Sequence, residues 1–365
     1  MNYNLKKSTQ STAGQPKRYG LVKLAQDVHA HTVVSCIQEE SQRPKPPRRA
    51  DPATHLERAR ELVLHSEQVH SCYEAGPTGF ALHRQLTDLG VQNIVVAPFC
   101  LDERGRRVNN DNTDTLGLAG RLDRYVAGNT RVFSVVRVPT VTEEQRRVWT
   151  RQRKQLQSQR LSVASQGRGL VLTQGQAISN EWWRPKAWKM HQTQLAPWLV
   201  EHLQIYRKII EVINEELKRI DEQIVAHRRS QGLEQPKWAG DLTLETIEAE
   251  VCDWQRFPSW RKAGCYSGLT GGVSSSGTSH SDLSITKVGN RRLRAALVEL
   301  AWRMARHQPN YWLTKKWQHI LGAQAKAHRR LRKKAIVAYA RALFVDLWKW
   351  KTGRVTAQKL GWEMV

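Results

Sequence analysis

The first third of the chain alternates between short apolar runs and longer segments with helical spacing. Apolar residues within 54–67 recur every three or four positions, as on one helix face, whereas 94–97 is a continuous apolar run of the kind found in buried strands. Segment 42–49, with three prolines, is predicted to be a loop. The pattern predicts an α/β domain with strands at 21–27, 32–37, 68–74 and 94–97, and helices at 54–67, 80–89 and from 111 onward.

The middle of the chain carries the longest helical patterns. Residues 140–166 predict one strongly basic helix. From Leu199 to Ile224, apolar residues recur in alternating steps of four and three, with charged residues between them, which is the pattern of a coiled-coil seam. The seam could pair within the chain or between subunits. Residues 182–189 interleave tryptophan with basic residues, which fits either stacking on unpaired bases or a small packed insertion.

The last third is predicted to be mainly helical. A helix is expected at 243–251, and the segment from Ile285 to Arg294 is expected to open a long one. Residues 270–279 between them are rich in Gly, Ser and Thr, so composition alone predicts a flexible linker, although the neighbouring segments argue against one. The expected parts of the chain are a flexible basic arm at 1–18, an α/β domain at 19–135, a basic helix, Trp-rich insertion and coiled coil at 136–232, and a C-terminal domain at 233–365.

Charge identifies the class of partner. The 365 residues carry a formal net charge of +25 and a pI near 10.3, and such an excess of positive charge usually indicates a polyanionic partner. A hydrophobic content of 40% with 14 Trp indicates folded protein rather than a basic tail. The apolar runs are far shorter than the roughly 20 residues of a membrane span, so no membrane partner is expected. Five scattered cysteines without metal-ligand spacing favour a reducing cytoplasm. With nucleic acid as the expected partner, we expect the protein to be associated with the nucleoid.

Two stretches concentrate the basic residues. The helix at 140–166 is expected to turn one side toward phosphates, although a merely solvated face would have the same composition. Residues 287–354 hold 18 Lys and Arg against two acids, Glu299 and Asp346. We therefore expect nucleic-acid contacts from Arg146, Arg147, Arg151, Lys287, Arg291, Arg292 and Arg294.

Four acids lie where strands end or a helix begins. Asp111 and Asp114 are three residues apart at a predicted helix start, so both side chains can point to one site. Asp27 lies near the end of the first strand, and Glu74 ends a later one. Converging carboxylates suit a divalent cation such as Mg²⁺, and two-metal sites of this kind catalyse phosphoryl transfer. The alternative interpretation is a turn residue at Asp27 and an acidic first helical turn that complements the helix dipole.

These acids lie in motifs that resemble a known family. The strings Asp27-Val28-His29, Tyr73-Glu74-Ala75-Gly76-Pro77-Thr78-Gly79 and Asn110-Asp111-Asn112-Thr113-Asp114 are similar to the acid motifs of the RuvC-like DEDD transposases of insertion sequence one-hundred-ten and its eleven-eleven subgroup. A more specific likeness lies in the second half, in Ala249 to Phe257, Tyr266-Ser267-Gly268-Leu269, Ser276-Gly277 and Ile285 to Arg294. The resemblance covers about Tyr19 to Trp348.

The resemblance implies a RuvC-like (RNase H-like) α/β domain joined by a coiled coil to a mainly α-helical C-terminal transposase domain. It implies that Asp27, Glu74, Asp111 and Asp114 bind Mg²⁺, and that Ser276, which precedes Gly277, attacks a DNA phosphate to form a phosphoserine link. The residues alone do not distinguish Ser276 from Ser274 or Ser275. The implied partners are donor and target DNA, a structured guide RNA, and further copies of the chain in a dimer or tetramer.

Two other functions are compatible with the same residues. A RuvC-like nuclease would hydrolyse DNA junctions with water, and Ser276 would then lie in a linker. A non-catalytic nucleic-acid-binding scaffold would keep the basic surface without a working acid site. A covalent protein–DNA adduct would separate the recombinase from both.

Overall fold

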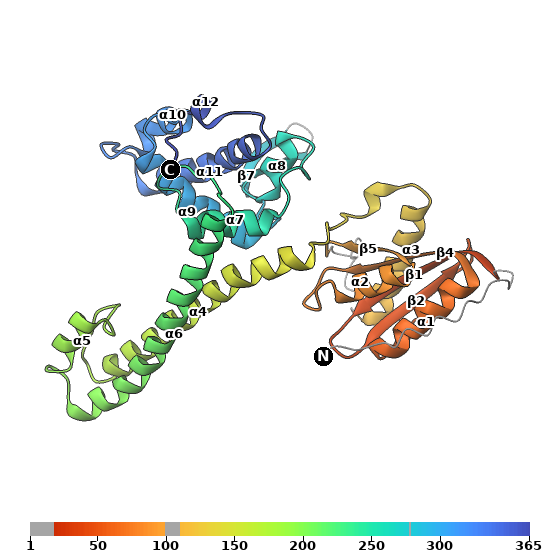
Figure 1. Ribbon diagram of the computed structural model, residues 1–365, viewed down its shortest axis with the longest axis horizontal. Helices are drawn as coiled ribbons and strands as arrows, with labels where there is room; N and C mark the ends of the chain where they lie inside the picture. Colours follow the sequence, from red (N-terminus) through yellow and green to blue (C-terminus); the bar gives the residue numbers. More distant parts are fainter. Residues whose placement is uncertain (1–17, 99–109, 277–278) are drawn as a thin grey trace. The chain divides into compact units, whose positions relative to one another are not determined.

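The computed structural model describes residues 18–98, 110–276 and 279–365 (Figure 1). The chain divides into two compact units, residues 1–138 and 139–365. Apart from Arg18, the predicted basic arm lies outside the described residues. Among the helices that the structure describes, none has the length and apolar character needed to cross a membrane.

The first unit is built on a five-stranded mixed sheet with the order β3-β2-β1-β4-β5. β1 pairs antiparallel with β2, which pairs antiparallel with β3, whereas β4 runs parallel to both β1 and β5. The predicted α/β alternation is confirmed, with one correction: the chain forms a short strand within the segment predicted as a loop. The strands are β1 (Tyr19–Val28), β2 (Val33–Glu39), β3 (Arg48–Ala50), β4 (Ser66–Glu74) and β5 (Gln92–Val96).

Helices cover both faces of this sheet. α3 (Asp111–Val126) packs on one face through Leu118, Ala119 and Leu122, and a 3-10 turn (Thr130–Val132) follows it. α1 (Pro52–His65) and α2 (Ala81–Asp88) pack on the other face through Ala59 and Leu86. Successive side chains of a strand point to opposite faces, so β1 contributes Leu24 to one layer and Ala25 to the other.

Two polar contacts fix β1 beside its helices. Lys23 is almost fully buried, and its Nζ lies 2.5 Å from Asp123 Oδ1 on α3. On the opposite side, Gln26 is buried and its Oε1 lies 2.6 Å from His55 Nε2 on α1. Burial, with a smaller contribution from Arg58, lowers the pKa of His55 to about 4, so this histidine is neutral at physiological pH. Both contacts hold the end of β1 that carries Asp27.

The second unit begins with a pair of long antiparallel helices, α4 (Val141–Leu172) and α6 (Pro197–Ser230) (Figure 1). A capping box between Thr140 and Glu143 starts α4, because each residue bonds to the backbone N–H of the other. The predicted apolar seam of α6 is buried within this single chain, at Leu199, Leu203, Ile210, Ile213, Leu217, Ile220 and Ile224.

The tryptophan-rich segment is packed at the end of this helical pair. Trp182 is fully buried, and its Nε1 donates a hydrogen bond to the carbonyl of Ala164 at 3.0 Å. Gly167 allows that approach, because a Cβ there would lie 2.5 Å from the Trp182 ring. Trp188, on α5 (Pro185–His191), packs into the same cluster. These two tryptophans therefore belong to a packed insertion.

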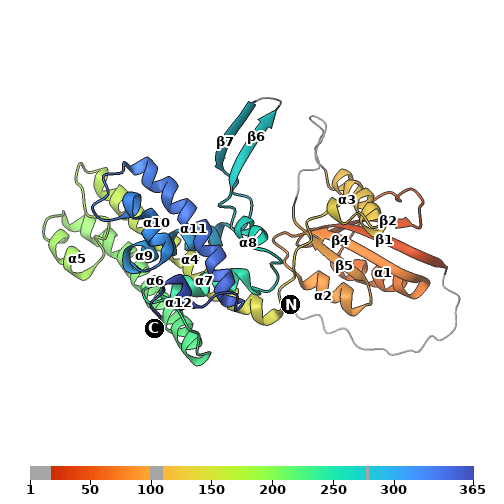
Figure 2. The same ribbon diagram turned by 90° about the horizontal axis from the view of Figure 1, so that it is seen from above.

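The rest of the second unit is a helical body with one hairpin. Its core is formed by α7 (Asp241–Val251), α8 (Trp260–Tyr266), α9 (Arg291–His307), α10 (Trp312–Leu321), α11 (Arg329–Lys351) and α12 (Ala357–Leu360). The hairpin of β6 (Gly271–Ser276) and β7 (Ser279–Ile285) extends from the end of α8 (Figure 2). The structure decides one question that composition left open and corrects one prediction. The small-residue segment pairs as strands, and the long helix starts at Arg291, because Ile285 ends β7 and Asn290 caps the helix.

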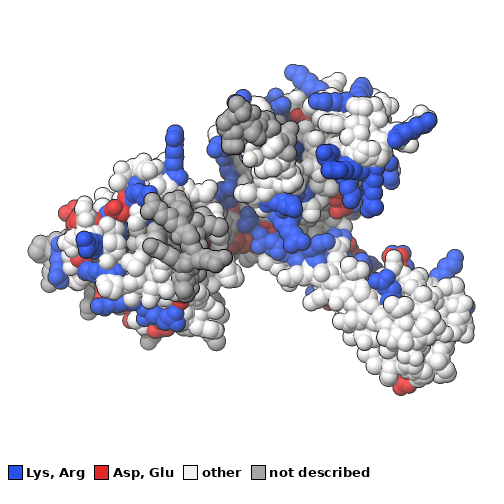
Figure 3. All heavy atoms as spheres, turned by 180° about the vertical axis from the view of Figure 1, so that it is seen from behind, with Lys and Arg blue, Asp and Glu red and all other residues white. Residues whose placement is uncertain are grey.

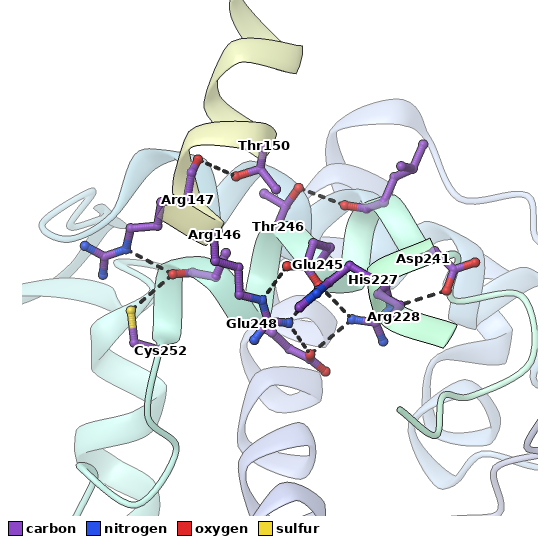
Figure 4. Close-up of polar contacts among 12 residues, drawn as sticks. Arg146, Arg147, Thr150, His227, Arg228, Asp241, Glu245, Thr246, Glu248 and Cys252 are labelled. Carbon is purple, nitrogen blue, oxygen red and sulfur yellow. Dashed lines mark hydrogen bonds and ion pairs between the residues drawn. The ribbon is translucent and has the colours of Figure 1, made fainter. Parts of the chain in front are cut away.

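Buried ion pairs join the helical pair to this body (Figure 4). Arg228, near the end of α6, is 1% exposed and lies 3.0 Å from Glu248 and 3.3 Å from Glu245, both on α7. Arg146 on α4 bonds to the same two glutamates. Burial acts to raise the pKa of Glu248, but Lys351, Arg228 and Arg146 outweigh it, so the pKa lies below its usual value. The carboxylate of Glu248 is therefore kept ionised inside the protein.

Replacing Arg228 with alanine should strongly destabilise the second unit. The change leaves buried carboxylates short of a counter-ion, and breaking a buried pair in this way typically costs about 3–5 kcal/mol. Urea unfolding followed by tryptophan fluorescence measures this unit alone, since all 14 Trp lie beyond residue 138. Arg229→Ala is the control, because Arg229 is exposed on the same turn. Equal losses in the two variants would contradict the proposed role of the buried network.

Candidate active site

Asp27 and Glu74 lie side by side at one edge of the sheet. The parallel register of β1 and β4 pairs Gln26 with Tyr73, and each acid is the next residue along its strand. Glu74 is also paired with Val96 of β5. The carboxyl ends of neighbouring parallel strands meet at one edge, where open α/β sheets commonly bind ligands. The structure thus brings together two of the acids predicted from the sequence.

The other two acids start the helix that packs on this sheet. Asp111 is the first residue of α3, and Asp114 lies in the same turn. Asn110 caps the helix, with its Oδ1 accepting a hydrogen bond from the backbone N–H of Thr113 at 2.8 Å. The cap fixes where α3 begins and therefore where the two carboxylates lie. Acids in the first turn are also stabilised by the helix dipole, which was the alternative interpretation of Asp111 and Asp114 from the sequence.

A histidine joins Asp27 and Asp111. The Nε2 atom of His29 lies 3.4 Å from Asp27 Oδ2 and 3.6 Å from Asp111 Oδ2. One ligand atom from each of these three residues falls within 4.8 Å of the others, close enough to share a cation. Sequence reasoning had not assigned a role to His29. Its place two residues after Asp27, just beyond the end of β1, is the signal that could have identified it.

Electrostatics ties Glu74 to the same group. The pKa of Glu74 is raised first by burial and then by the negative charges of Asp27 and Asp114, with Arg121 acting in the opposite direction. Glu74 therefore senses one acid on the adjacent strand and one on α3. Three of the four acids predicted from the sequence are therefore close enough to interact electrostatically.

Arg49 provides part of the counter-charge within the first unit. Its Nη2 lies 2.5 Å from Asp111 Oδ2, and the arginine side chain is 63% exposed. Arg49 lies on β3, the strand that the sequence pattern did not predict. An exposed ion pair of this kind contributes little to stability, so its exchange for a metal or a phosphate costs little.

A cavity of about 680 Å³ opens beside the acids. Asp27, His29 and Glu74 lie on its wall, together with the turn at Gly76 and Pro77 and part of α2. Asp27 and Asp111 are 29% and 35% exposed, so both remain accessible to solvent. The cavity gives a substrate access to the carboxylate side of the sheet edge.

The donor atoms at this edge fit Mg²⁺. Carboxylate oxygens are the hard ligands that this ion prefers, and Asp27 and Asp111 supply them beside His29, whereas Glu74 and Asp114 lie outside this group of three. The pKa of Glu74 is raised mainly by burial, and the negative charges of Asp27 and Asp114 add to the shift. Cys36 and Cys72, the two cysteines described in the first unit, are buried.

The serine assigned from the resemblance lies in the second unit. Ser276 is the last residue of β6 and pairs with Ser279, while Ser275 pairs with His280 and Ser274 with Ser281. The base of the hairpin is a close crossing of two chain segments, at Gly268 and Gly289. Both glycines have positive φ, and a Cβ at Gly268 would lie 2.4 Å from the carbonyl oxygen of Val288. The backbone therefore anchors the hairpin firmly at its base.

The seven predicted nucleic-acid contacts fall into two groups. Those on α4 already have partners inside the second unit: Arg146 on Glu245 and Glu248, Arg147 on the Ala249 carbonyl, and Arg151 on Glu250. Arg294 donates to the carbonyls of Ser267 and Lys287 at the hairpin base. Side-chain partners within the described chain are absent for Lys287, Arg291 and Arg292, and all three are exposed.

Glu250 connects these two regions of the second unit. Its carboxylate accepts a hydrogen bond from Arg151 at 3.1 Å and one from Asn290 Nδ2 at 2.7 Å. Burial acts to raise the pKa of Glu250, but the bonds from Arg151 and Asn290 lower it below the usual value. Asn290 in turn caps α9 immediately after the hairpin. Arg151, which was predicted to contact a phosphate, therefore contributes to the contacts that stabilise the start of α9 next to the hairpin.

Comparisons with known proteins agree on one family. The family model described as Transposase IS116/IS110/IS902 matches residues 232–318. A protein of Sinorhizobium fredii named "Putative transposase y4rJ" is 32% identical over 308 residues, which cover 78% of this chain and 77% of that protein. A second protein of the same organism, "Putative transposase y4qE", is 30% identical over 67% of this chain and 60% of its own length.

A third relative matches a shorter segment. The transposase for insertion sequence element IS1533 of Leptospira borgpetersenii is 34% identical over 77 residues, or 21% of this chain and 22% of that protein. The long match to the first relative extends well beyond the segment covered by the family model. On these matches, the chain belongs to the IS116/IS110/IS902 family of transposases.

Proposed function

We propose that this transposase cuts and rejoins DNA with its carboxylate site and a serine nucleophile. In this proposal Asp27, Glu74, Asp111 and Asp114 hold Mg²⁺ in a RuvC-like first unit. The observation that supports it most is the placement of the acids: Asp27 and Glu74 end adjacent parallel strands, and Asp111, in the first turn of α3, lies within 4.8 Å of Asp27 and His29 ligand atoms. The bound ion would stabilise negative charge on the phosphate that reacts.

The residues around the acids would position the DNA strand. His29 lies between Asp27 and Asp111 and can accept or donate a proton at the same edge. Arg49 is exposed enough to leave Asp111 and bind a phosphate oxygen. The adjacent cavity, with Glu74 on its wall, would admit the strand to this edge of the sheet.

Ser276 would supply the nucleophile from the hairpin of the second unit. Its Oγ forms a bond to the phosphorus, the bond from phosphorus to the neighbouring nucleotide oxygen breaks, and the serine proton passes to a base. The resulting ester conserves the energy of the phosphodiester for rejoining. The family resemblance supports the choice of Ser276 over Ser274 and Ser275.

The proposal includes the partners that the resemblance implies. These are donor and target DNA, a structured guide RNA and further copies of the chain. The formal net charge of +25 supports polyanionic partners. We assign phosphate contacts to the exposed Lys287, Arg291 and Arg292, and a mainly structural role to the arginines of α4 that bind the acids of α7. A cytoplasmic, nucleoid-associated location would follow.

Asp111→Asn should lower DNA cleavage by at least ~100-fold, because each carboxylate contributes to charge stabilisation at the reacting phosphate. DNA binding should change little, since the basic surface is intact. Cleavage of a labelled donor substrate with Mg²⁺ and guide RNA measures the first effect, and a filter-binding assay measures the second. Asp88→Asn, an exposed acid at the end of α2, is the control. Undiminished cleavage by the Asp111 variant would contradict a shared site.

Glu74→Gln should stabilise the protein when divalent metal is chelated. A folded-state pKa above the unfolded value means that the ionised carboxylate costs stability at neutral pH. That cost disappears as the pH falls below the unfolded pKa, roughly 4.3. Calorimetric scans in chelator should therefore show a higher Tm for the variant at pH 7 and no difference near pH 4. Glu67→Gln, exposed on the same strand, should leave the Tm unchanged.

Ser276→Ala should remove both the covalent protein–DNA adduct and recombination, while Ser274→Ala and Ser275→Ala retain much of each. A denaturing gel of protein incubated with labelled donor DNA, guide RNA and Mg²⁺ detects the adduct. Adduct formation by the Ser276 variant would show that another residue is the nucleophile. Nicking that requires Mg²⁺ but never gives an adduct in the parent protein would indicate a hydrolytic nuclease instead.

A further inference from the structure

The second unit contains a cavity of about 670 Å³ that takes no part in the proposed chemistry. Four helices line it: α4, α6, α7 and α9. Its volume is in the range of small-molecule and cofactor sites. Figure 3 shows lysine and arginine side chains gathered on the second unit, where the helical pair meets the helical body.

The rim of this cavity carries positive charge that the protein does not neutralise. Lys154 on α4 and Arg291 and Arg292 on α9 lie on the rim and are exposed. Within the described part of the second unit, residues 139–276 and 279–365, no carboxylate lies within ion-pair distance of these three side chains. They come from two helices that are distant in sequence, so their convergence at one opening is a property of the fold.

The acids of the cavity are already matched by other residues. Asp241 lies 3.3 Å from Arg228, and Glu299 lies 2.9 Å from Arg303. Arg153, also in the lining, forms an ion pair with Asp221. The positive charge that remains unpaired in the lining is therefore that of the three rim cations. It favours a ligand with more than one negative charge, or a phosphate of a nucleic-acid backbone.

The interior combines apolar and hydrogen-bonding surface. Leu242, Val225 and two alanines of α9, Ala295 and Ala296, provide the apolar part. Gln157 presents an amide that can both donate and accept, and no hydrogen bond is made by this amide within the described residues. An interior that offers both kinds of hydrogen bond beside apolar walls is unsuited to a purely aliphatic ligand.

Three threonines, Thr150, Thr243 and Thr246, also line the cavity, and two of them donate their hydroxyls to backbone carbonyls. The hydroxyl of Thr246 donates to the carbonyl of Leu242 at 2.8 Å, and that of Thr150 donates to the carbonyl of Arg147 at 3.1 Å. Each hydroxyl oxygen therefore keeps lone pairs that can accept a further hydrogen bond. Donors and acceptors on one flat apolar ring are the features of a nucleobase, and the rim cations match the phosphate attached to it.

From this geometry, we propose that the cavity between α4, α6, α7 and α9 binds one unpaired nucleotide of a nucleic-acid strand, with the base inside and its phosphate on Lys154, Arg291 and Arg292. A base can enter only after it leaves the stack, so the site selects single-stranded or flipped-out positions. The same chemistry would serve an RNA or a DNA strand. The site uses neither the acids of the first unit nor the serine hairpin, so it is independent of the proposed cleavage reaction.

Photocrosslinking tests the site directly with the full-length protein. Short single strands carrying one 4-thiouridine (RNA) or one 4-thiothymidine (DNA) serve as probes, and the same sequences in duplex form serve as controls. Crosslinks are mapped by mass spectrometry after trypsin digestion. We expect them in the peptides 155–160, which contains Gln157, and 295–303, which contains Ala295. Whichever single strand gives these crosslinks identifies the source of the nucleotide.

Variants that fill the cavity, or that remove a hydrogen-bonding group from it, without changing the net charge distinguish binding of the base from nonspecific attraction of phosphates to the basic surface. Ala295→Trp should lower crosslinking to both peptides roughly tenfold, in line with the contribution of one bound base. Gln157→Leu should lower it in the same direction by removing hydrogen bonds to the base, and it carries the test if the tryptophan variant fails to fold. Ser158→Trp and Gln155→Leu, exposed positions on α4 outside the lining, are the matched controls.

Two results would overturn the proposal. The first is crosslinking that maps only to other basic surfaces of the protein. The second is crosslinking to the two peptides that is unchanged by both Ala295→Trp and Gln157→Leu. Because the readout is binding, either result leaves the proposed cleavage reaction untouched, and loss of cleavage in the acid variants leaves this site untouched.

Discussion

In the first unit, two strand ends and the start of one helix place four carboxylates at one edge of the sheet. Asp27 and Glu74 are adjacent because β1 and β4 run parallel, and α3 adds the acids of its first turn. Burial, and to a smaller extent the negative charges of Asp27 and Asp114, raise the pKa of Glu74. The surrounding structure holds the acids in place through Lys23 with Asp123 and through Gln26 with His55. A fold that keeps like charges together in this way is suited to a cation and, through it, to a phosphate.

In the second unit, by contrast, buried carboxylates are neutralised by basic side chains of the same unit. The acids of α7 accept arginines from both long helices and a lysine from α11. Such a network adds little stability relative to an apolar core, but it is costly to break. Through Glu250 and Asn290 the network also reaches the start of α9, which follows the hairpin. The orientation of the helical pair, the hairpin base and the rim of the nucleotide cavity thus rest on one set of contacts.

Sequence patterns predicted much of this structure where local signals were strong. The strand ends with acids, the capped start of α3 and the long seam of α6 all follow from short-range periodicity and capping residues. β3 was missed because three residues flanked by prolines carry no strand signal, and it gains its pairing only from β2. The hairpin was obscured because Gly and Ser dominate it, so register rather than residue type defines its strands.

Basic residues were the least predictable from sequence. Arg146 and Arg151 resemble phosphate ligands until α7, about a hundred positions later, places glutamates against them. Lys154, on the same helix, faces a cavity instead. Charge along a helix therefore predicts that partners exist, whereas only the tertiary structure shows whether each partner is a carboxylate of the chain or a phosphate from outside.

Electron paramagnetic resonance of Mn²⁺, used as a substitute for Mg²⁺, tests the central claim most directly. Free Mn²⁺ gives a sharp spectrum that is lost on binding, so titration counts the ions held by the full-length protein. The shared carboxylate site predicts that Asp27→Asn, Glu74→Gln, Asp111→Asn and Asp114→Asn each weaken binding of the same ion, while Asp88→Asn does not. Parent-like binding in all four variants would contradict the account.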